Sequence, residues 1–302
     1  MSSLKHSLLG FKKEKEYLIG IDSDGCVFDT MEIKHKECFC PAFISHFNMQ
    51  AVSKYAREAW EFINLYSQSR GENRFLALIH VLDLLKKRVE ALNRKVNIPN
   101  MTKLHNWILR ESKLGNPTLK QAVQDDPHPD LISALNWSLD VNCAIKKIVR
   151  NVPPFPFVRE CFEKITGKAD VIAVSSAPYD ALKREWYEHD IAKYVKIIAG
   201  QEMGTKTEHI TNLGLGNYQR ENILIIGDAP GDFKAARANN AHFYPIIPGQ
   251  EVLSWQRLYE EALDKFFAGL YEGNYESNLL KEFEAHLPEY PSWQDIISAP
   301  II

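Results

Sequence analysis

The segment Tyr17-Leu-Ile-Gly-Ile-Asp22-Ser-Asp24-Gly-Cys-Val-Phe-Asp29 determines how the rest of the chain is interpreted. It opens with a short apolar run, which is typical of a buried strand. Asp22 and Asp24 end this run, and because side chains alternate along a strand, both carboxylates point to one side. Gly25 permits a turn that a residue with a Cβ would resist. Two adjacent carboxylates need a cation or a shared proton between them. The pattern predicts a Mg²⁺ site at a strand end; a polar turn after a strand is the alternative.

The composition is that of an ordinary soluble globular protein. The 302 residues are 45% apolar and 25% charged, which suits one large domain or two smaller ones. The formal charge of −3 argues against general nucleic-acid binding, and no apolar stretch is long enough to span a bilayer. Residues 1–16 lack the apolar core of a signal peptide, and the five cysteines form no Cys-x-x-Cys pair. We therefore expect a cytoplasmic protein with reduced thiols.

Residues 30–151 show helical periodicity and no convincing strand. Apolar residues recur at helical spacing in 53–67, 75–92, 101–111 and 130–149. The closely spaced prolines of Asn151-Val-Pro-Pro-Phe-Pro end this pattern, because proline is not tolerated inside a helix. We therefore expect residues 30–151 to form an all-helical domain inserted into the rest of the chain.

Beyond the prolines, short apolar runs alternate with helical segments. The strands expected after the first one are 170–175, 195–199, 222–227 and 242–247. The last is expected at a sheet edge, because Pro245 lacks an amide donor. This alternation predicts a parallel sheet with helices on both faces. The expected fold class is α/β and Rossmann-like, with a discontinuous catalytic core of residues 1–29 and 152–302 and a helical cap of residues 30–151.

Ligands of open parallel sheets bind at the carboxyl ends of the strands. Besides the acids of the first strand, these ends carry Ser175-Ser176-Ala-Pro and Gly227-Asp228-Ala-Pro-Gly-Asp232, and Gly204-Thr-Lys206 precedes the latter. A carboxylate can approach a phosphate dianion only if that charge is screened, and Mg²⁺, a lysine and backbone donors would screen it. The residues themselves therefore favour phosphoryl-transfer chemistry at this edge.

These motifs, in this order, resemble those of the haloacid dehalogenase superfamily. The resemblance is to the phosphatase branch with an inserted helical cap, as in phosphoglycolate phosphatase and β-phosphoglucomutase-like members. It covers residues 17–29 and about 155–248, whereas the cap agrees only in position and helical character. The dehalogenases and phosphonatases of this superfamily lack the second acid, so Asp24 argues against both. Cys26 stands where the family usually has threonine, which we interpret as tolerated variation or, alternatively, as a redox-sensitive thiol.

The resemblance implies a role for each catalytic residue. Asp22 is the nucleophile that forms an aspartyl-phosphate, and Asp24 is the general acid and base. Lys206 offsets phosphate charge and positions the nucleophile; on spacing alone it would be a surface lysine.

The same resemblance implies a metal site and a phosphate site. Asp22, the backbone carbonyl of Asp24, Asp228 and Asp232 are the expected Mg²⁺ ligands, Asp232 through metal-bound water. Ser175 is expected to hold a phosphate oxygen. Ser176 adds a backbone donor ahead of the helix start at Pro178, and one of the two serines is expected to cap that helix.

One feature of the cap predicts substrate contacts. Ser69-Arg70-Gly71-Glu72 fits a capping box with Ser69 as the N-cap, which would place Arg70 and Arg74 on one face of a helix's first turns. A helix start with two guanidiniums favours anions. We expect both arginines to contact the second anionic or hydroxyl-rich part of the substrate; a pair of surface arginines is the alternative.

The sequence thus predicts a Mg²⁺-dependent phosphomonoesterase acting on a small phosphorylated metabolite. The alternatives are a phosphomutase of the β-phosphoglucomutase type and a non-catalytic member that binds a phosphorylated ligand or a protein. No nucleic acid or membrane is expected as a partner, and the chain is expected to be a monomer or a homodimer. Residues 249–302 are expected to add helices that brace the core or form a dimer contact.

Overall fold

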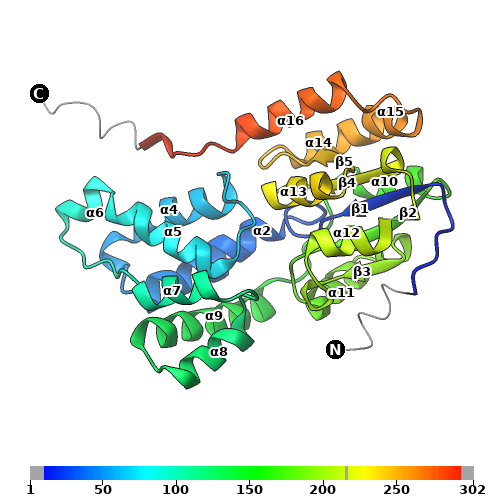
Figure 1. Ribbon diagram of the computed structural model, residues 1–302. Coiled ribbons are helices and arrows are strands. Elements are labelled where there is room, and N and C mark those ends of the chain that lie inside the picture. The colour runs from blue at the N-terminus through cyan, green and yellow to red at the C-terminus, as the bar shows by residue number, and fades with distance from the viewer. Residues whose placement is uncertain (1–9, 215–216, 294–302) are drawn as a thin grey trace, which may run out of the picture. The chain divides into compact units, whose positions relative to one another are not determined.

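The computed structural model describes residues 10–214 and 217–293, and these divide into two compact units (Figure 1). The core unit contains the described residues of 10–31 and 151–287, and the helical unit contains 32–150 and 288–293. The expected cap was 30–151. Residues 288–293, which we expected in the core, instead belong to the helical unit, because Trp293 packs against its apolar cluster. No helix among the described residues is long and apolar enough to cross a membrane.

A five-stranded parallel sheet forms the centre of the core unit. Its strands are β1 (Tyr17–Ile21), β2 (Ala169–Val174), β3 (Ile197–Ala199), β4 (Ile223–Gly227) and β5 (His242–Pro245). Their order is β3-β2-β1-β4-β5, and every neighbouring pair is parallel. The predicted α/β parallel sheet is confirmed, and β5 lies at an edge as expected. Because β1 is central, the ends of β2 and β4 flank the residues that follow it.

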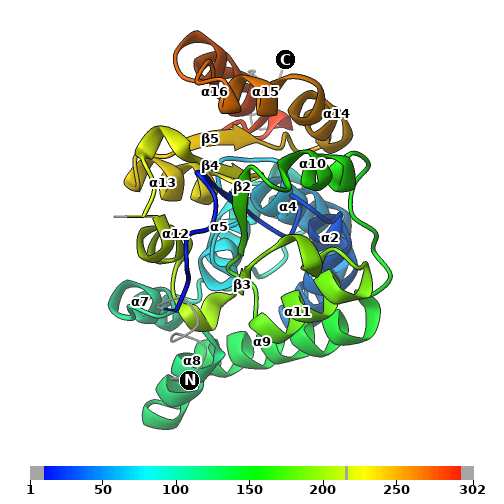
Figure 2. The same ribbon diagram turned by 90° about the vertical axis from the view of Figure 1, so that its right-hand side faces the viewer.

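Helices cover both faces of this sheet. They are α10 (Val158–Ile165), α11 (Tyr179–Glu188), α12 (Lys206–Gly214), α13 (Pro230–Ala238), α14 (Glu251–Arg257), α15 (Leu263–Phe267) and α16 (Asn274–His286), with a π-helix at Leu258–Ala262. Figure 2 shows α10 and α11 on one side of the strands and α12 and α13 on the other. Leu18 and Ile19 enter separate apolar clusters, one on each face. A strand buried on both faces reads as a continuous apolar run, which is why the strands were detectable.

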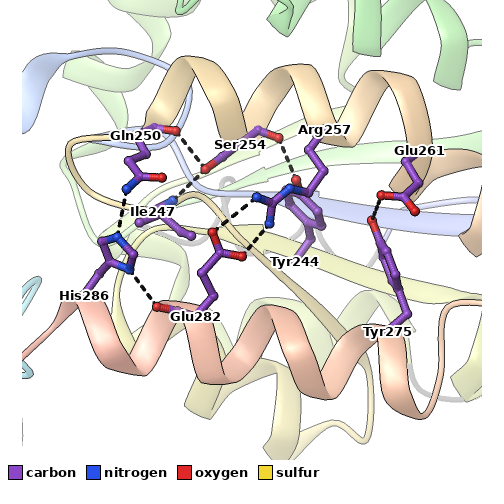
Figure 3. Close-up of polar contacts among 9 residues, drawn as sticks. All are labelled: Tyr244, Ile247, Gln250, Ser254, Arg257, Glu261, Tyr275, Glu282 and His286. Atoms are coloured by element: carbon purple, nitrogen blue, oxygen red, sulfur yellow. Dashed lines mark hydrogen bonds and ion pairs between the residues drawn. The ribbon is translucent and has the colours of Figure 1, made fainter.

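Polar contacts attach α14 and α16 to each other and to β5 (Figure 3). The Tyr244 hydroxyl donates to the Ser254 carbonyl over 2.6 Å, and the Ser254 hydroxyl accepts from the Ile247 amide over 3.0 Å. Arg257 donates two hydrogen bonds to the carboxylate of Glu282 on α16. These contacts make the helices after β5 a fixed part of the core unit.

Residues 30–150 form helices, and no strand occurs between 32 and 150, all of which are described. The helices are α2 (Thr30–Ile33), a π-helix (Lys34–Phe39), α3 (Cys40–His46), α4 (Ser53–Leu65), α5 (Arg74–Lys86), α6 (Val89–Asn93), α7 (Thr102–Arg110), α8 (Asn116–Asp125) and α9 (Pro129–Ile148). The single helix expected over 75–92 is wrong, because the backbone of Arg88 is extended and separates α5 from α6. The fully buried rings of Phe43, Trp60 and Trp137 lie in the core of this unit.

The capping box expected at Ser69 is also wrong. Asn73 caps α5, since its side chain accepts from the Phe75 amide over 3.0 Å. The Ser69 hydroxyl instead donates to the Ile63 carbonyl over 2.8 Å, near the end of α4. Gly71 has a φ of 76°, so the chain reverses between Ser69 and the true helix start.

Candidate active site

Asp22 follows β1 at the middle of the sheet. Its amide continues the sheet hydrogen bonding by donating to the Ile226 carbonyl over 3.0 Å. Asp22 is 6% exposed, so the carboxylate is held away from bulk water. This central strand end is where the topology predicts ligand binding.

Three carboxylates meet at this place. Oxygens of Asp22, Asp228 and Asp232 lie within 4.8 Å of one another, and all three residues are buried. Gly227 allows this approach, because a Cβ there would lie 2.4 Å from the Cβ of Asp232. The sequence prediction placed these acids at two strand ends, and the structure brings them together.

Lys206, the first residue of α12, joins this acid cluster. Its Nζ lies 3.0 Å from Asp22 Oδ2 and 2.5 Å from Asp232 Oδ1. Burial alone would lower the pKa of Lys206, but the two carboxylates outweigh it and raise the pKa above its ordinary value. The lysine therefore stays protonated and places one positive charge beside the three carboxyl groups.

A buried group of three carboxyl side chains beside one lysine fits a divalent cation. Burial raises the pKa of Asp22 well above its usual range; Lys206 opposes this, whereas Asp232 and Asp228 add to it. Asp22 Oδ1 is buried and has no hydrogen-bond partner among the described residues. A buried carboxylate oxygen without a partner is costly unless something binds it. Three hard oxygen donors around such an atom match the ligand preference of Mg²⁺.

Asp24 is held by a residue that sequence reasoning missed. The hydroxyl of Thr30, at the start of α2, donates to Asp24 Oδ1. Thr30 is fully buried and Asp24 is partly exposed. Gly25, with a φ of 77°, donates its amide to the Phe28 carbonyl over 2.8 Å and so closes the intervening turn. The hydrogen bond fixes the orientation of the expected general acid.

Ser175 and Ser176 follow β2, the strand beside β1. Ser175 is buried, and its hydroxyl accepts from the Ala177 amide over 3.2 Å. Ser176 is exposed. The Ala177 amide is thus already engaged, and Ser175 closes the turn after the strand.

The helix after these serines is capped differently from our expectation. Pro178 is the N-cap of α11 and offers no side-chain acceptor. The amide of Tyr179 donates instead to the carboxylate of Glu202 over 2.9 Å. The start of α11 is therefore capped by the side chain of Glu202, 23 residues away in the chain. The prediction that a serine caps this helix is wrong.

The two arginines expected to contact substrate lie in the helical unit and differ in environment. Arg70 is 3% exposed, and its Nη1 donates to the Leu65 carbonyl over 2.8 Å. Arg74 is the first residue of α5, and its Nη1 donates to the hydroxyl of Ser138 over 2.9 Å and to Asn142 over 2.8 Å. Arg70 lies in the turn before the helix, so the two residues do not share a helical face.

Two further residues support the segment around Asp22. The indole of Trp186 on α11 donates to the hydroxyl of Ser23 over 3.0 Å. Cys26 is fully buried and its thiol contacts the Ile226 carbonyl at 3.7 Å. Burial raises the pKa of Cys26 well above its ordinary value, which disfavours the reactive thiolate. These features favour a structural role for Cys26 over redox sensing.

No family model and no curated protein matches the sequence. Similar solved structures include a haloacid dehalogenase-like family hydrolase from Xanthomonas campestris, at 12% identity and a TM-score of 0.45 over 86% of this chain and 95% of that one. A HAD-superfamily hydrolase from Geobacter sulfurreducens shares 14% identity and a TM-score of 0.38, over 76% of this chain and 86% of that one. A predicted phosphoglycolate phosphatase from Haemophilus somnus shares 13% identity and a TM-score of 0.39, over 78% of this chain and 86% of that one.

Proposed function

We propose that this protein is a Mg²⁺-dependent phosphomonoesterase of the haloacid dehalogenase type, acting on a small phosphorylated metabolite. The observation that carries the proposal is the buried cluster of Asp22, Asp228 and Asp232 with Lys206. Asp22 Oδ1, buried and without a hydrogen-bond partner among the described residues, supports a cation at this cluster. A cluster of this charge at a strand end suits the binding of a metal and a phosphate together.

The metal would be held by the carboxylates of Asp22 and Asp228 and by the backbone carbonyl of Asp24, with Asp232 supporting it. When bound, Mg²⁺ supplies charge screening between a phosphate dianion and the attacking carboxylate. Lys206 adds a second positive charge, since its raised pKa keeps it protonated. Ser175 supplies a hydroxyl for a phosphate oxygen, and the backbone of Ser176 adds a donor beside it.

The proposed reaction has two displacements at phosphorus. A carboxylate oxygen of Asp22 bonds to phosphorus as the bond to the ester oxygen breaks, and Asp24 gives its proton to that leaving oxygen. Asp24 then takes a proton from water, which attacks the aspartyl-phosphate. The P–O bond to Asp22 breaks, which regenerates the Asp22 carboxylate and releases inorganic phosphate. Thr30 holds Asp24 in place for both proton transfers.

The arginines of the helical unit are the proposed contacts for the rest of the substrate. Arg74 carries the stronger argument, because burial lowers its pKa to about 10 and no acidic side chain pairs with it among the described residues. Because its hydrogen-bond acceptors are neutral, the positive charge of Arg74 is not offset by them and can pair with an anionic group of the substrate. If Arg70→Ala and Arg74→Ala both leave the KM of the best substrate unchanged, neither residue contacts the substrate.

The proposal is tested by phosphate release from sugar phosphates, nucleotides and phosphoglycolate, with and without Mg²⁺. We expect metal-dependent release that is lost in Asp22→Asn, a change that keeps the shape of the side chain but removes the nucleophile. Release that persists in Asp22→Asn would contradict the assigned nucleophile.

A phosphomutase of the β-phosphoglucomutase type is the second candidate, because Asp24 can take the proton from a second substrate hydroxyl instead of from water, so that this hydroxyl attacks the aspartyl-phosphate. Isomerisation of a hexose phosphate without phosphate release would favour it. Tight binding of a phosphorylated compound without any turnover would instead favour the non-catalytic alternative.

A further inference from the structure

The segment after α16 leads from one unit to the other. The chain passes between the units at 31/32, at 150/151 and again at 287/288. The first two passages are the ends of the inserted helical region. The third is an additional connection, made by residues 288–292 between Leu287 in the core unit and Trp293 in the helical unit.

The start of this segment is fixed to the core unit. Leu287 is 1% exposed and belongs to the apolar cluster on the α12 and α13 side of the sheet. Just before it, His286 Nδ1 lies 2.8 Å from the Glu282 carbonyl, and His286 Nε2 lies 2.8 Å from the Gln250 amide nitrogen (Figure 3). A carbonyl oxygen only accepts, so Nδ1 carries the proton and Nε2 accepts from Gln250.

The end of the segment is fixed to the helical unit. The guanidinium carbon of Arg88 lies 4.4 Å from the centre of a Trp293 ring and 5.0 Å from that of Tyr55. The edge of Trp293 meets Phe62 on α4, with 5.7 Å between ring centres. A cation–π contact is stronger when the guanidinium is largely desolvated, as that of Arg88 is.

Arg88 is a rigid anchor for that ring. It is 7% exposed, and its other contacts are the carboxylates of Glu58, at 2.5 Å, and Glu90, at 2.9 Å. The same residue separates α5 from α6, so its backbone is part of the helical framework of this unit.

The connection between the two anchors is short. Five residues, 288–292, separate Leu287 from Trp293, and two of them are Pro288 and Pro291. Six Cα–Cα steps span about 20 Å at full extension. Prolines favour an extended backbone and make a linker semi-rigid. The distance between the anchors cannot exceed this reach while both are in place.

We propose that residues 287–293 are a tether that limits how far the helical unit can move relative to the core unit. Units joined by an insertion's two ends ordinarily hinge about them. Here wider movement requires Trp293 to leave Arg88. The inference concerns motion alone and stands or falls independently of the proposed chemistry.

The tether is tested by distance measurements between spin labels on the two units. Cys143 is exposed on α9, and the other four cysteines are buried. Leu253→Cys on α14, at a residue that is 59% exposed, provides the second label. One variant inserts about ten Gly and Ser residues between Tyr290 and Pro291, which lengthens the tether but keeps both anchors. The other variant is Trp293→Ala, and the control is Tyr290→Ala at a position that is 63% exposed.

We expect the insertion and Trp293→Ala to broaden the distance distribution towards longer values, while Tyr290→Ala matches the unmodified tether. A distribution unchanged by the insertion overturns the proposal, because a segment under no length limit is not a tether. If the distance distribution broadens in Trp293→Ala but not in the insertion variant, the proposal is also overturned, because Trp293 then contributes only to packing. Circular dichroism and thermal unfolding verify that each variant is folded.

Discussion

Single residues set the electrostatics at the end of β1. Lys206 contacts two of the three clustered carboxylates, and Gly227 leaves the space that lets Asp232 approach. The strand ends predicted that Asp22, Asp228 and Asp232 would meet, because parallel strands present their carboxyl ends at one edge, and the resemblance to the family added Lys206. The contacts of Thr30, Trp186 and Glu202 could not be predicted, because small hydroxyls, buried rings and surface acids occur throughout the chain without distinctive spacing.

Thr30→Val tests the support given to Asp24. Valine keeps the shape and burial but cannot donate to Asp24 Oδ1. We expect kcat for the best substrate to fall about tenfold or more, because a misplaced proton donor loses its geometric advantage. Thr30→Ser, which retains the hydroxyl, should recover most of the rate. Equal rates in Thr30→Val and the unchanged protein would exclude this positioning role.

We expect His209 on α12 to make the free energy of unfolding depend on pH. It is fully buried, and burial lowers its pKa from 6.5 to about 4. Below pH 6.5 the unfolded chain binds a proton at His209 that the folded chain does not, so the free energy of unfolding falls as pH drops towards 4. The loss reaches about 3 kcal/mol.

Urea unfolding at several pH values between 7 and 4 measures this dependence. His209→Gln, which does not titrate, should show a shallower decline than the unchanged protein over this range. Parallel declines would mean that His209 is protonated to the same degree in both states.

At the scale of elements, buried apolar runs predicted the secondary structure most reliably. Each strand was predicted to within a few residues, because a strand covered on both faces has an apolar sequence throughout. The split between α5 and α6 was missed, since the extended backbone of Arg88 accompanies tertiary contacts with Glu58 and Trp293. The start of α5 was misplaced, because Ser69 is used by the preceding helix. A tertiary contact accompanies the first difference, and a local contact with Ile63 accompanies the second.

Ser254→Ala tests how α14 is joined to β5. The Ser254 hydroxyl accepts from the buried Ile247 amide and donates to the Gln250 carbonyl. Its removal leaves the amide without that acceptor, so we expect the free energy of unfolding to drop by about 1–3 kcal/mol. Ser277→Ala, at an exposed position of α16, is the matched control and should change stability little. A similar effect of both changes would show that the contact adds no stability.

For the whole molecule, a cation at the acid cluster should couple metal binding to folding. A ligand that binds only the folded state stabilises it by about 2.7 kcal/mol at 100 times its Kd. We expect Mg²⁺ to raise the Tm of the unchanged protein and to have little effect on Asp228→Asn. Without metal, the variant should be at least as stable as the parent, because one buried negative charge is gone. An equal Mg²⁺ shift in both proteins would place the metal elsewhere.

The most direct test of the account is to trap the covalent intermediate. The best substrate of the panel is mixed with the protein and Mg²⁺, turnover is stopped with acid, and borohydride reduces any acyl phosphate to the alcohol. We predict that peptide mass spectrometry will find homoserine in place of Asp22, and that Asp24→Asn, which forms but does not hydrolyse the intermediate, will increase it. Steady phosphate release with Asp22 unmodified, or modification at a different carboxylate, would contradict the assignment of Asp22 as the nucleophile.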